Sequence, residues 1–496
     1  MTPRRLVLFN PRSSASAKPV LPMSLLAVEA GLEGRLPAQL VDGNLEHDPV
    51  AALVAAIAGT PDEVVLGVTV MPGPQLEQAL PVCRELKRRH PALTVVWGGY
   101  FPSQHWRPCV ADPAVDYVVR GHGERVFAEL VDHLTTGSPT PAQIPGLAYP
   151  AADGAPRSGE RAPVPKPAEL PDWNLELVDM PRYLRRTFLG RRTVGYHSSY
   201  GCPYRCNFCA VVTLVDGRWL AQPAARVAGV VRDWRRRWGV DAVEMNDNNF
   251  FVHEGRVREF SERIANLGVA WWGEGRIDTL LGFDDATWRA MRDGGLKMVF
   301  LGAESGSEET LRRMDKGGSV SPAATLEMVR AMRHWGIVPE LSFVLGNPPD
   351  PEADAAGTLA FIRRVKQVNP ATEIILYLYT PVPLAGELYE EAQASGFAFP
   401  ETLDAWVSRD WLDFVQRRSR TMPWIRRDLQ QRLRDFERVL NAYYPTSTLP
   451  SLGRARRTLL RTLAAWRWHS HTYAWPLELA ALHRVMAYRR PETSGF

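Results

Sequence analysis

The sequence predicts an α/β protein made of two parallel-sheet domains and a helical C-terminal segment. In residues 1–137, and again in 189–400, short apolar runs alternate with helical patterns, as is typical of βαβ units. A proline-rich stretch, 138–188, separates the two regions, and 401–496 changes to a composition rich in arginine and tryptophan. With 496 residues, 45% of them hydrophobic and 23% charged, the chain is long enough for several globular cores.

In the first region, five apolar runs predict the buried strands of a doubly wound parallel sheet, with helices such as Pro49–Ala58 and Gln75–Arg89 between them. The predicted strands are Arg5–Phe9, Gln39–Asp42, Val64–Thr69, Thr94–Trp97 and Asp116–Val119. Ligands bind such sheets beyond the carboxyl ends of the strands. Taken singly, most glycines there could equally serve tight turns. The candidate ligand contacts at these ends are Asn10, Asp42, Asn44, Thr69, Gly98, Gly99, Gly121 and Glu124.

The segment 138–188 is expected to be a linker or a segment that wraps over the surface, because its many prolines remove backbone donors and stiffen the chain. The region after it predicts six further strands, and hence a full or partial (β/α)6 barrel with its site at the strand carboxyl ends. These strands are Thr193–His197, Ala242–Asn246, Trp271–Glu274, Met298–Gly302, Glu340–Val344 and Glu373–Tyr379. The helices between them include Ala225–Trp238, Glu254–Asn266, Asp284–Asp293, Glu308–Met314 and Ala323–Trp335.

The segment 401–496 differs in charge from the rest of the chain. It holds 17 Arg, no Lys and nine Asp or Glu, a net charge of +8, so the preceding 400 residues carry −4 of the overall +4. Six of the 16 tryptophans also lie here. A helical apolar stripe is predicted, flanked by Arg454, Arg457 and Arg461. The stripe consists of Leu459, Leu460, Leu463 and Trp466.

Several classes of protein are excluded by these patterns. No uninterrupted run of about 18 apolar residues appears, which argues against a membrane-spanning helix. The first residues contain only Leu6–Phe9 as an apolar stretch, too short for a secretory signal, so we expect a cytoplasmic protein. Five cysteines, three of them within eight residues, suit a metal site in a reducing compartment better than a disulfide framework.

The strongest motif is GCPYRCNFC, residues 201–209, in which Cys202, Cys206 and Cys209 have Cys-x3-Cys-x2-Cys spacing directly after a predicted strand. Three thiolates on one loop can hold three irons of a [4Fe–4S] cluster and leave the fourth iron open to another ligand. Zinc is the competing interpretation, but a structural zinc site needs four ligands, and only His197 is near enough in sequence to be the fourth.

This motif resembles the radical S-adenosylmethionine (SAM) superfamily in spacing, strand-loop placement and barrel context. The resemblance implies that SAM binds the open iron and that an electron from an external donor of the flavodoxin or ferredoxin type cleaves it to methionine and a 5'-deoxyadenosyl radical. Phe208 matches the aromatic residue that lies against the adenine in that family.

Further stretches resemble the cobalamin-binding branch of this superfamily over roughly residues 5–395. In the first region these are LFNP, VDGNLEHDP, VVWGGYFPS and VDYVVRGHGE, and in the second they are GEGRID and LGAESGSEETLRRMDKG. The resemblance implies a Rossmann-like B12-binding domain at 1–137, a radical SAM barrel at 189–400, and cobalamin as a third cofactor.

One departure concerns the cobalt ligand. The Asp-x-His-x-x-Gly motif of many free-standing B12 domains is absent, because Asp42 is followed by Gly43 and Asn44, and His47 comes five positions on. Members of the radical SAM branch often lack this motif too. His47 is therefore expected mainly as a surface histidine, and His105 and His122 are further weak candidates.

Polar residues follow the second, third and fourth predicted barrel strands. By resemblance, they would contact the amine, carboxylate and ribose of SAM, and the guanidinium of Arg276 suits a carboxylate. The alternative is a ring of salt bridges that closes the barrel. Tyr377 and Tyr379 could face the substrate or simply pack. The candidate SAM contacts are Asp247, Glu274, Arg276, Glu304 and Ser305.

The other two cysteines, Cys83 in a predicted helix and Cys109 in a predicted loop, are expected to be structural. Being 26 positions apart, they cannot supply the second three-cysteine cluster that methylthiotransferases of this superfamily need in their N-terminal domain. That activity is therefore excluded by the sequence.

Three functions stay open. The leading one is methylation of an unactivated carbon of a small molecule, with methylcobalamin as the methyl donor. The second is an oxidative cyclisation or rearrangement like that of the anaerobic magnesium-protoporphyrin monomethyl ester cyclase, and the third is a non-catalytic cobalamin and Fe–S sensor. Three interpretations of the arginine-rich tail stay open. It could be a helical cap over the barrel, or a peripheral contact with a membrane, which would suit a lipid-soluble substrate. Binding of nucleic acid is the weakest interpretation.

Overall fold

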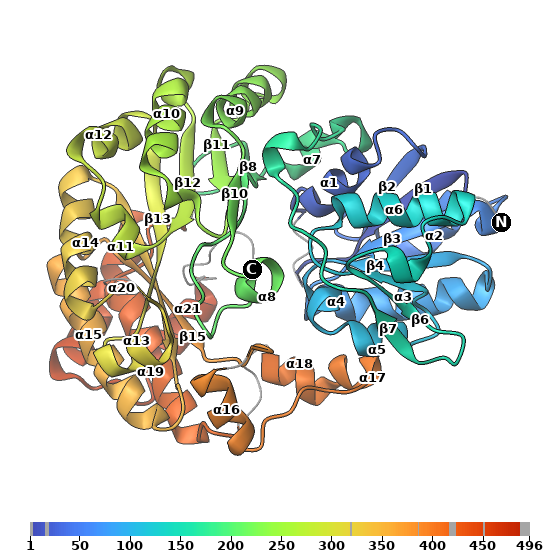
Figure 1. Cartoon of the computed structure of the whole chain (residues 1–496). Helices are drawn as coiled ribbons and strands as arrows, with labels where there is room; N and C mark the ends of the chain where they lie inside the picture. The colour runs from blue at the N-terminus through green and yellow to red at the C-terminus, as the bar shows by residue number, and fades with distance from the viewer. Residues whose placement is uncertain are drawn as a thin grey trace. The chain divides into compact units, whose positions relative to one another are not determined.

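The computed structural model describes residues 3–14, 19–317, 320–384, 386–415, 423–449 and 452–486. Parts of the arginine-rich tail, 416–422, 450–451 and 487–496, therefore lie outside the described residues. The chain forms two compact units. The first comprises the described residues of 1–183, 213–216 and 399–419, and the second comprises those of 184–212, 217–398 and 423–486 (Figure 1).

The first unit contains a seven-stranded sheet of order β2-β1-β3-β4-β5-β6-β7. Its first five strands are parallel and confirm the five predicted ones: β1 (Arg5–Asn10), β2 (Ala38–Asp42), β3 (Val64–Thr69), β4 (Thr94–Gly98) and β5 (Tyr117–Val119). The prediction of a linker over 138–188 misses two antiparallel strands, β6 (Leu147–Pro150) and β7 (Pro156–Ser158), which extend the sheet. Strands this short and proline-flanked carry no clear period-2 pattern.

Residues of the central strands alternate between two hydrophobic cores, one on each face of this sheet. On β1, Val7 and Phe9 belong to one core, and Leu6 and Leu8 belong to the other. Because a strand directs successive side chains to opposite faces, a strand covered by helices on both sides becomes a continuous apolar run. The helices are α1 (Met23–Gly31), α2 (Pro49–Ile57), α3 (Pro74–Arg89), α4 (Tyr100–Gln104), α5 (Trp106–Val110), α6 (Gly123–Thr136) and α7 (Met180–Tyr183).

A segment distant in sequence completes the first unit. The short helix α17 (Leu403–Trp406) places both of its terminal side chains in the core that also holds Phe9. Asp404 forms an ion pair with Arg84 of α3, with 2.7 Å between carboxylate oxygen and Nη1. The following helix is α18 (Arg409–Val415). Residues predicted to belong to the tail thus pack with the N-terminal sheet.

The second unit contains a six-stranded parallel sheet in which the strands follow one another in sequence order. Its strands confirm the six predicted ones: β8 (Thr193–Tyr196), β11 (Ala242–Met245), β12 (Ala270–Gly275), β13 (Leu296–Glu304), β14 (Val338–Leu345) and β15 (Glu373–Leu378). The arrangement is the predicted partial (β/α)6 barrel, with helices outside the curved sheet (Figure 1). These helices are α9 (Ala224–Trp238), α10 (Glu254–Ile264), α11 (Ile277–Leu281), α12 (Asp285–Asp293), α13 (Glu308–Arg313), α14 (Pro322–Trp335), α15 (Pro351–Val368) and α16 (Glu387–Ala394).

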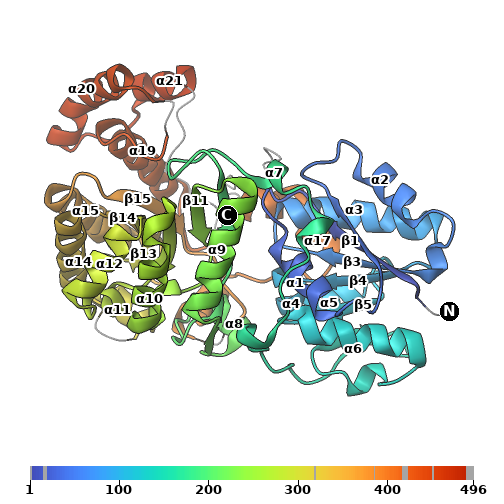
Figure 2. The ribbon, with the colours of Figure 1, turned by 90° about the horizontal axis from the view of Figure 1, so that it is seen from above.

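Three C-terminal helices pack within the second unit: α19 (Arg427–Tyr443), α20 (Arg454–Ser470) and α21 (Leu477–Val485). Figure 2 shows them side by side. They are attached to the barrel through α15, because Arg363 donates a hydrogen bond to the Trp468 carbonyl and lies over the Trp468 ring. Across the described ranges, no helix has the length and apolar content needed to cross a bilayer.

Candidate functional site

The cysteine loop is enclosed by a small antiparallel pair of strands. Strand β9 (Ser199–Gly201) pairs with β10 (Trp219–Ala221), so the chain between them, 202–218, forms a long loop that contains the short helix α8 (Val211–Val215). Gly201 has φ +83°, a left-handed conformation that favours glycine at the point where the strand turns into the loop. The pair anchors both ends of the segment that carries the three cysteines.

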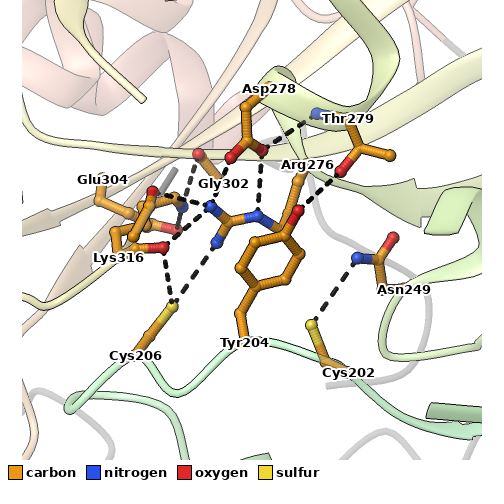
Figure 3. A network of polar contacts seen from close by, with 11 residues as sticks. Cys202, Tyr204, Cys206, Asn249, Arg276, Asp278, Thr279, Gly302, Glu304 and Lys316 are labelled. Atoms are coloured by element: carbon orange, nitrogen blue, oxygen red, sulfur yellow. Dashed lines mark hydrogen bonds and ion pairs between the residues drawn. The ribbon is translucent and has the colours of Figure 1, made fainter. Parts of the chain in front are cut away.

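Arg276, which follows β12, connects this loop to the barrel (Figure 3). Its guanidinium forms two hydrogen bonds with Asp278, of 3.0 and 2.8 Å, and donates another of 2.9 Å to the Lys316 carbonyl. It lies over the Tyr204 ring at 3.5 Å from the centroid, and its Nη1 is 3.6 Å from Cys206 Sγ. Binding of the SAM carboxylate by this guanidinium stays a prediction; in the structure the guanidinium contacts the cysteine loop.

Lys316 forms the second cationic group at this place. Its Nζ donates 2.6 and 2.7 Å hydrogen bonds to Glu304 Oε1 and to the Gly302 carbonyl. A Cβ at Gly302 would lie 2.1 Å from Glu304 Oε1 and 2.6 Å from Lys316 Nζ, so a larger residue there would displace this ion pair. Glu304 itself has φ +61°, which is uncommon for a side-chain-bearing residue and turns the backbone at the end of β13.

The groups around the three thiols are chemically suited to a metal site. Burial raises the pKa of Cys206, while nearby Lys316 and Arg276 act in the opposite direction by favouring the thiolate. Burial also raises the pKa of Cys209 to about 12. Cys202 Sγ accepts a 3.7 Å contact from Asn249 Nδ2. A metal that deprotonates these thiols would find positive charge and amide donors beside the sulfur atoms.

The three cysteines carry free thiols. Among the described residues, no three His, Cys, Asp or Glu side chains are arranged closely enough to hold a metal ion. The fit to a cluster therefore rests on the donor set, three thiols on one loop, and on the cationic and amide groups beside two of them.

Asp247 and Ser305, two predicted SAM contacts, are fully buried and already hydrogen-bonded within the protein. Asp247 accepts from Ser198 Oγ at 2.9 Å and from Ser199 Oγ. Ser305 Oγ bonds Asp354 Oδ1 at 3.2 Å and Thr358 Oγ1 at 3.1 Å. These contacts order the strand ends, and the prediction of a direct SAM contact stays a prediction.

Glu274 lies at the end of β12, and its carboxyl group has an altered pKa. Burial, with additional repulsion from Glu340 and Asp247, raises this pKa to about 8. A carboxyl group of this kind is mostly protonated at neutral pH, so it can donate a hydrogen bond as well as accept one.

Unpaired buried polar atoms gather after the first two barrel strands. His197 Nε2, Asn246 Oδ1 and Asn249 Oδ1 have no hydrogen-bond partner in the described structure. Leaving such atoms unpaired costs about 1–3 kcal/mol each, so their presence favours a polar ligand at this edge. The carboxyl ends of parallel strands meet at one edge, and these atoms and the cysteine loop follow such ends.

Phe208 is partly buried, and Lys316 Nζ lies 5.9 Å from its ring centroid. Tyr379 is 1% exposed, packs against Trp424 and has an unpaired hydroxyl, whereas Tyr377 is half-buried. Residue-level reasoning missed Tyr204, Asn249, Asp278 and Lys316 as neighbours of the cysteines. Local signals existed for three of them, because Tyr204 lies inside the cysteine motif, Asp278 lies in the stretch GEGRID, and Lys316 lies in LGAESGSEETLRRMDKG.

In the first unit, the predicted polar residues at the strand ends are buried and bonded to one another. Asp42 Oδ1 accepts from the backbone and side-chain nitrogens of Asn44 at 2.9 and 2.7 Å, and Asp42 Oδ2 accepts from the Tyr183 hydroxyl at 2.9 Å. Asn10 Oδ1 accepts from Gln75 Nε2 at 3.0 Å. Tyr183, which comes from the end of the segment predicted as a linker, was not foreseen.

Close approach explains some of the remaining strand-end positions. Gly99 has φ +95°, and a Cβ there would lie 3.0 Å from Thr69 Oγ1, whereas Gly121, with φ +80°, has open space. A Cβ at Gly98 would meet Val119 at ordinary contact distance. Glu124 lies in the first turn of α6, and its carbonyl would be 2.6 Å from a Cβ at Gly31, so this backbone packs tightly on α1.

The three histidines considered for cobalt occupy different surroundings. His47 is exposed, and His122 precedes α6. The His105 ring packs against Phe399 and Trp406, with centroids 4.9 and 4.4 Å away, and burial lowers its pKa to about 4. It belongs to an aromatic cluster of the core.

Cys83 and Cys109 are both fully buried, as expected of structural cysteines. Cys83 accepts a 3.3 Å hydrogen bond from Trp97 Nε1. The expectation that Cys109 lies in a loop is wrong, because it is part of the short helix α5.

Two family models match the chain: one described as B12 binding domain, over residues 15–131, and one described as Radical SAM superfamily, over residues 196–362. The uncharacterized methyltransferase PH0819 of Pyrococcus horikoshii is 26% identical over 372 residues, which are 73% of this chain and 78% of that protein. An anaerobic magnesium-protoporphyrin IX monomethyl ester cyclase of Synechocystis is 29% identical over 265 residues, about half of each chain (52% and 51%).

Two solved structures share the fold. The radical SAM methyltransferase TsrM of Kitasatospora setae, solved with cobalamin and a [4Fe–4S] cluster, matches with a TM-score of 0.63 and 20% identity over 80% of this chain and 75% of that one. The cobalamin-dependent radical SAM enzyme OxsB, solved with aqua-cobalamin and SAM, matches with a TM-score of 0.65 and 14% identity over 98% and 76%. Residues 15–131 therefore belong to the B12 binding domain family and residues 196–362 to the radical SAM superfamily, in the order that the sequence predicted.

Proposed function

We propose that this protein is a methyltransferase that uses a [4Fe–4S] cluster, SAM and cobalamin to methylate an unactivated carbon of a small molecule. The observation that carries the proposal is the contact of Cys206 with Arg276, which joins the three-cysteine loop to the charged carboxyl edge of the barrel. The methyltransferase relatives and the B12-binding domain favour methyl transfer among the reactions of this family.

The cofactors would supply the bond-breaking chemistry. In each turnover, one SAM would be cleaved to methionine and 5'-deoxyadenosine, which carries away the substrate hydrogen, and a second SAM would give its methyl group and become S-adenosylhomocysteine. An external donor of the flavodoxin or ferredoxin type would supply two electrons. Cys202, Cys206 and Cys209 would hold the cluster. Phe208, Asp247, Glu274, Arg276, Glu304 and Ser305 remain the proposed SAM contacts, and the strand-end residues of the first unit remain the proposed cobalamin contacts.

The residues of the barrel edge prepare the site for these groups. Arg276 and Lys316 place two positive charges near Cys206, which offsets the negative charge of ligating thiolates. Glu304 is neutralised by Lys316, so it presents no isolated negative charge. The protonated carboxyl of Glu274 can donate a hydrogen bond to a ligand carboxylate or hydroxyl, a task that an ionised glutamate could not perform.

Anaerobic reconstitution with iron and sulfide, followed by reduction with dithionite in the presence of SAM, tests the proposal. We expect a broad visible absorption band that reduction bleaches, and formation of 5'-deoxyadenosine. A Cys206→Ala variant is expected to lose both, whereas Cys83→Ala, which changes a cysteine in the hydrophobic core of the first unit, is the matched control. SAM cleavage that persists in Cys206→Ala would contradict the proposal.

An oxidative cyclisation is the second candidate, favoured by the identity with the magnesium-protoporphyrin ester cyclase. Methyl-labelled SAM separates the two. Label in the product indicates methylation, while a product that is oxidised and unlabelled indicates the cyclase chemistry. If the reduced and reconstituted protein consumes no SAM at all, the sensor hypothesis replaces both.

A further inference from the structure

Helix α20 has two apolar faces, of which only one is used in packing. Leu460, Ala464 and Trp468 are buried, and the Trp468 ring stacks on Tyr443 of α19 with 5.6 Å between centroids. The predicted single stripe of Leu459, Leu460, Leu463 and Trp466 is therefore wrong, because Leu460 faces inward while the other three are 45%, 38% and 55% exposed. The attachment of α20 does not depend on the three exposed side chains.

These three residues form one outward face, which we call the Leu-Trp face. Leu459, Leu463 and Trp466 are spaced by four and three residues, which places them on the same side of an α-helix. Directly after α20, Trp475 and Leu477 are also strongly exposed, at 67% and 69%. Isolated exposed apolar residues are ordinary on protein surfaces, but a stripe at helical spacing indicates a contact surface.

The charge on α20 has one sign. Its 17 residues contain five arginines and no Asp or Glu. Arg456 is exposed and lies three residues before Leu459, on the same side of the helix. Arg454 and Arg456 stand in the first turn, where the helix dipole disfavours positive charge. This placement costs helix stability, so Arg454 and Arg456 are not explained by stabilisation of the helix.

We propose that the Leu-Trp face of α20 binds the surface of an anionic lipid bilayer, with Leu459, Leu463 and Trp466 inserted at the headgroup boundary and Arg456 near the lipid phosphates. Apolar side chains beside arginines suit this interface. A second copy of the chain is a poorer occupant, because pairing two such helices face to face brings like charges together. A nucleic acid would use the arginines but not the exposed leucines.

Flotation of the full-length protein with vesicles tests this inference. We expect binding to vesicles of phosphatidylglycerol mixed with phosphatidylcholine, little binding to phosphatidylcholine alone, and weakening at high salt, because charges at the surface are screened. The inference is independent of the proposed reaction, so the experiment requires no turnover.

Two variants locate the surface. The triple change Leu459→Ser, Leu463→Ser and Trp466→Ser should weaken vesicle binding by about 100-fold or more, since it removes the apolar contact area. Arg456→Glu should weaken it by about 5- to 30-fold, on the basis of about 1 kcal/mol for each charge near the surface. All four side chains are exposed, so an unchanged circular dichroism spectrum and melting temperature are expected.

The matched controls are Thr458→Ser on the same helix and Arg236→Glu on α9, whose side chain is 79% exposed. Both should bind vesicles like the wild type. The inference is overturned if the wild type does not float with anionic vesicles, if it binds neutral vesicles equally well, or if the triple variant binds as tightly as the wild type. A wild type that ignores vesicles but forms a dimer that the triple variant abolishes in analytical ultracentrifugation would assign the face to self-association instead.

Discussion

The guanidinium of Arg276 lies over the ring of Tyr204, with 3.5 Å between the guanidinium carbon and the ring centroid. Tyr204 stands between the first two cysteines of the loop, and its hydroxyl is 3.3 Å from Thr279 Oγ1 on α11. The same guanidinium contacts Cys206 Sγ and pairs with Asp278. One side chain therefore fixes the loop against the barrel by stacking, by charge and by hydrogen bonding.

Arg276→Lys should impair cluster assembly although it preserves the charge. A lysine cannot form the two-pronged contact with Asp278 or cover the Tyr204 ring as a planar group does. We expect iron to be held about 10- to 100-fold more weakly, the usual effect of losing a residue that supports a metal ligand. Iron and sulfide content after reconstitution measures this. The control is Arg292→Lys on α12, which removes a guanidinium that lies over the Trp335 ring of α14. Full iron loading of Arg276→Lys would contradict the assignment.

Tyr183→Phe should weaken cobalamin binding without unfolding the protein. The Tyr183 hydroxyl donates to the buried carboxylate of Asp42, and its loss leaves one carboxylate oxygen short of a donor at a strand end. A lost hydrogen bond to a charged group costs about 1.5–3 kcal/mol, equivalent to roughly a 10- to 150-fold change in a binding constant. The amount of cobalamin retained after gel filtration, read from its visible spectrum, gives the result. Tyr149→Phe on β6 is the control, and unchanged retention would exclude this role.

Gly99→Ala and Gly121→Ala should differ in severity although both glycines have positive φ. Each substitution imposes a backbone cost of about 1 kcal/mol. Only at Gly99 would the new methyl group also meet Thr69 Oγ1 and the Val70 backbone at 3.0 and 3.1 Å. We therefore expect a clearly lower melting temperature for Gly99→Ala than for Gly121→Ala. Equal melting temperatures would show that the strand ends yield more easily than these distances indicate.

Glu340→Gln should stabilise the protein at alkaline pH and remove part of the pH dependence of its stability. Burial raises the pKa of Glu340 to about 8 from an ordinary value of 4.5. Between these two values the folded state binds more protons than the unfolded state, so stability falls as pH rises through this window. Glutamine is neutral and its side-chain oxygen can still accept the 2.9 Å hydrogen bond from Trp272 Nε1.

The effect of Glu340→Gln is measured as the melting temperature against pH. The variant should match the wild type near about pH 5 and exceed it near about pH 8, by a free energy on the order of 1–3 kcal/mol. Glu262→Gln, at an exposed position of α10, is the control and should leave the profile unchanged. A variant less stable than the wild type at about pH 8 would mean that the Glu340 carboxylate is ionised and well stabilised.

The sequence by itself determined the strands of both sheets. Val64–Thr69 and Ala242–Met245 are buried along their whole length, and strands covered on both faces are mostly apolar runs that can be recognised from the local sequence. It also determined the cysteine loop, because Cys202, Cys206 and Cys209 are close in the chain and their spacing carries its own chemistry.

Only the tertiary structure decided which side chains surround those cysteines. Lys316 is 110 residues from Cys206, and no local periodicity reports a contact over that distance. Local sequence likewise does not show that Trp406 packs against His105. It also does not show that Leu460 of α20 is buried while the neighbouring Leu459 is exposed. Local sequence patterns determine which residues form a helix or strand and how apolar that element is. Which element packs against each of its faces depends on the tertiary structure.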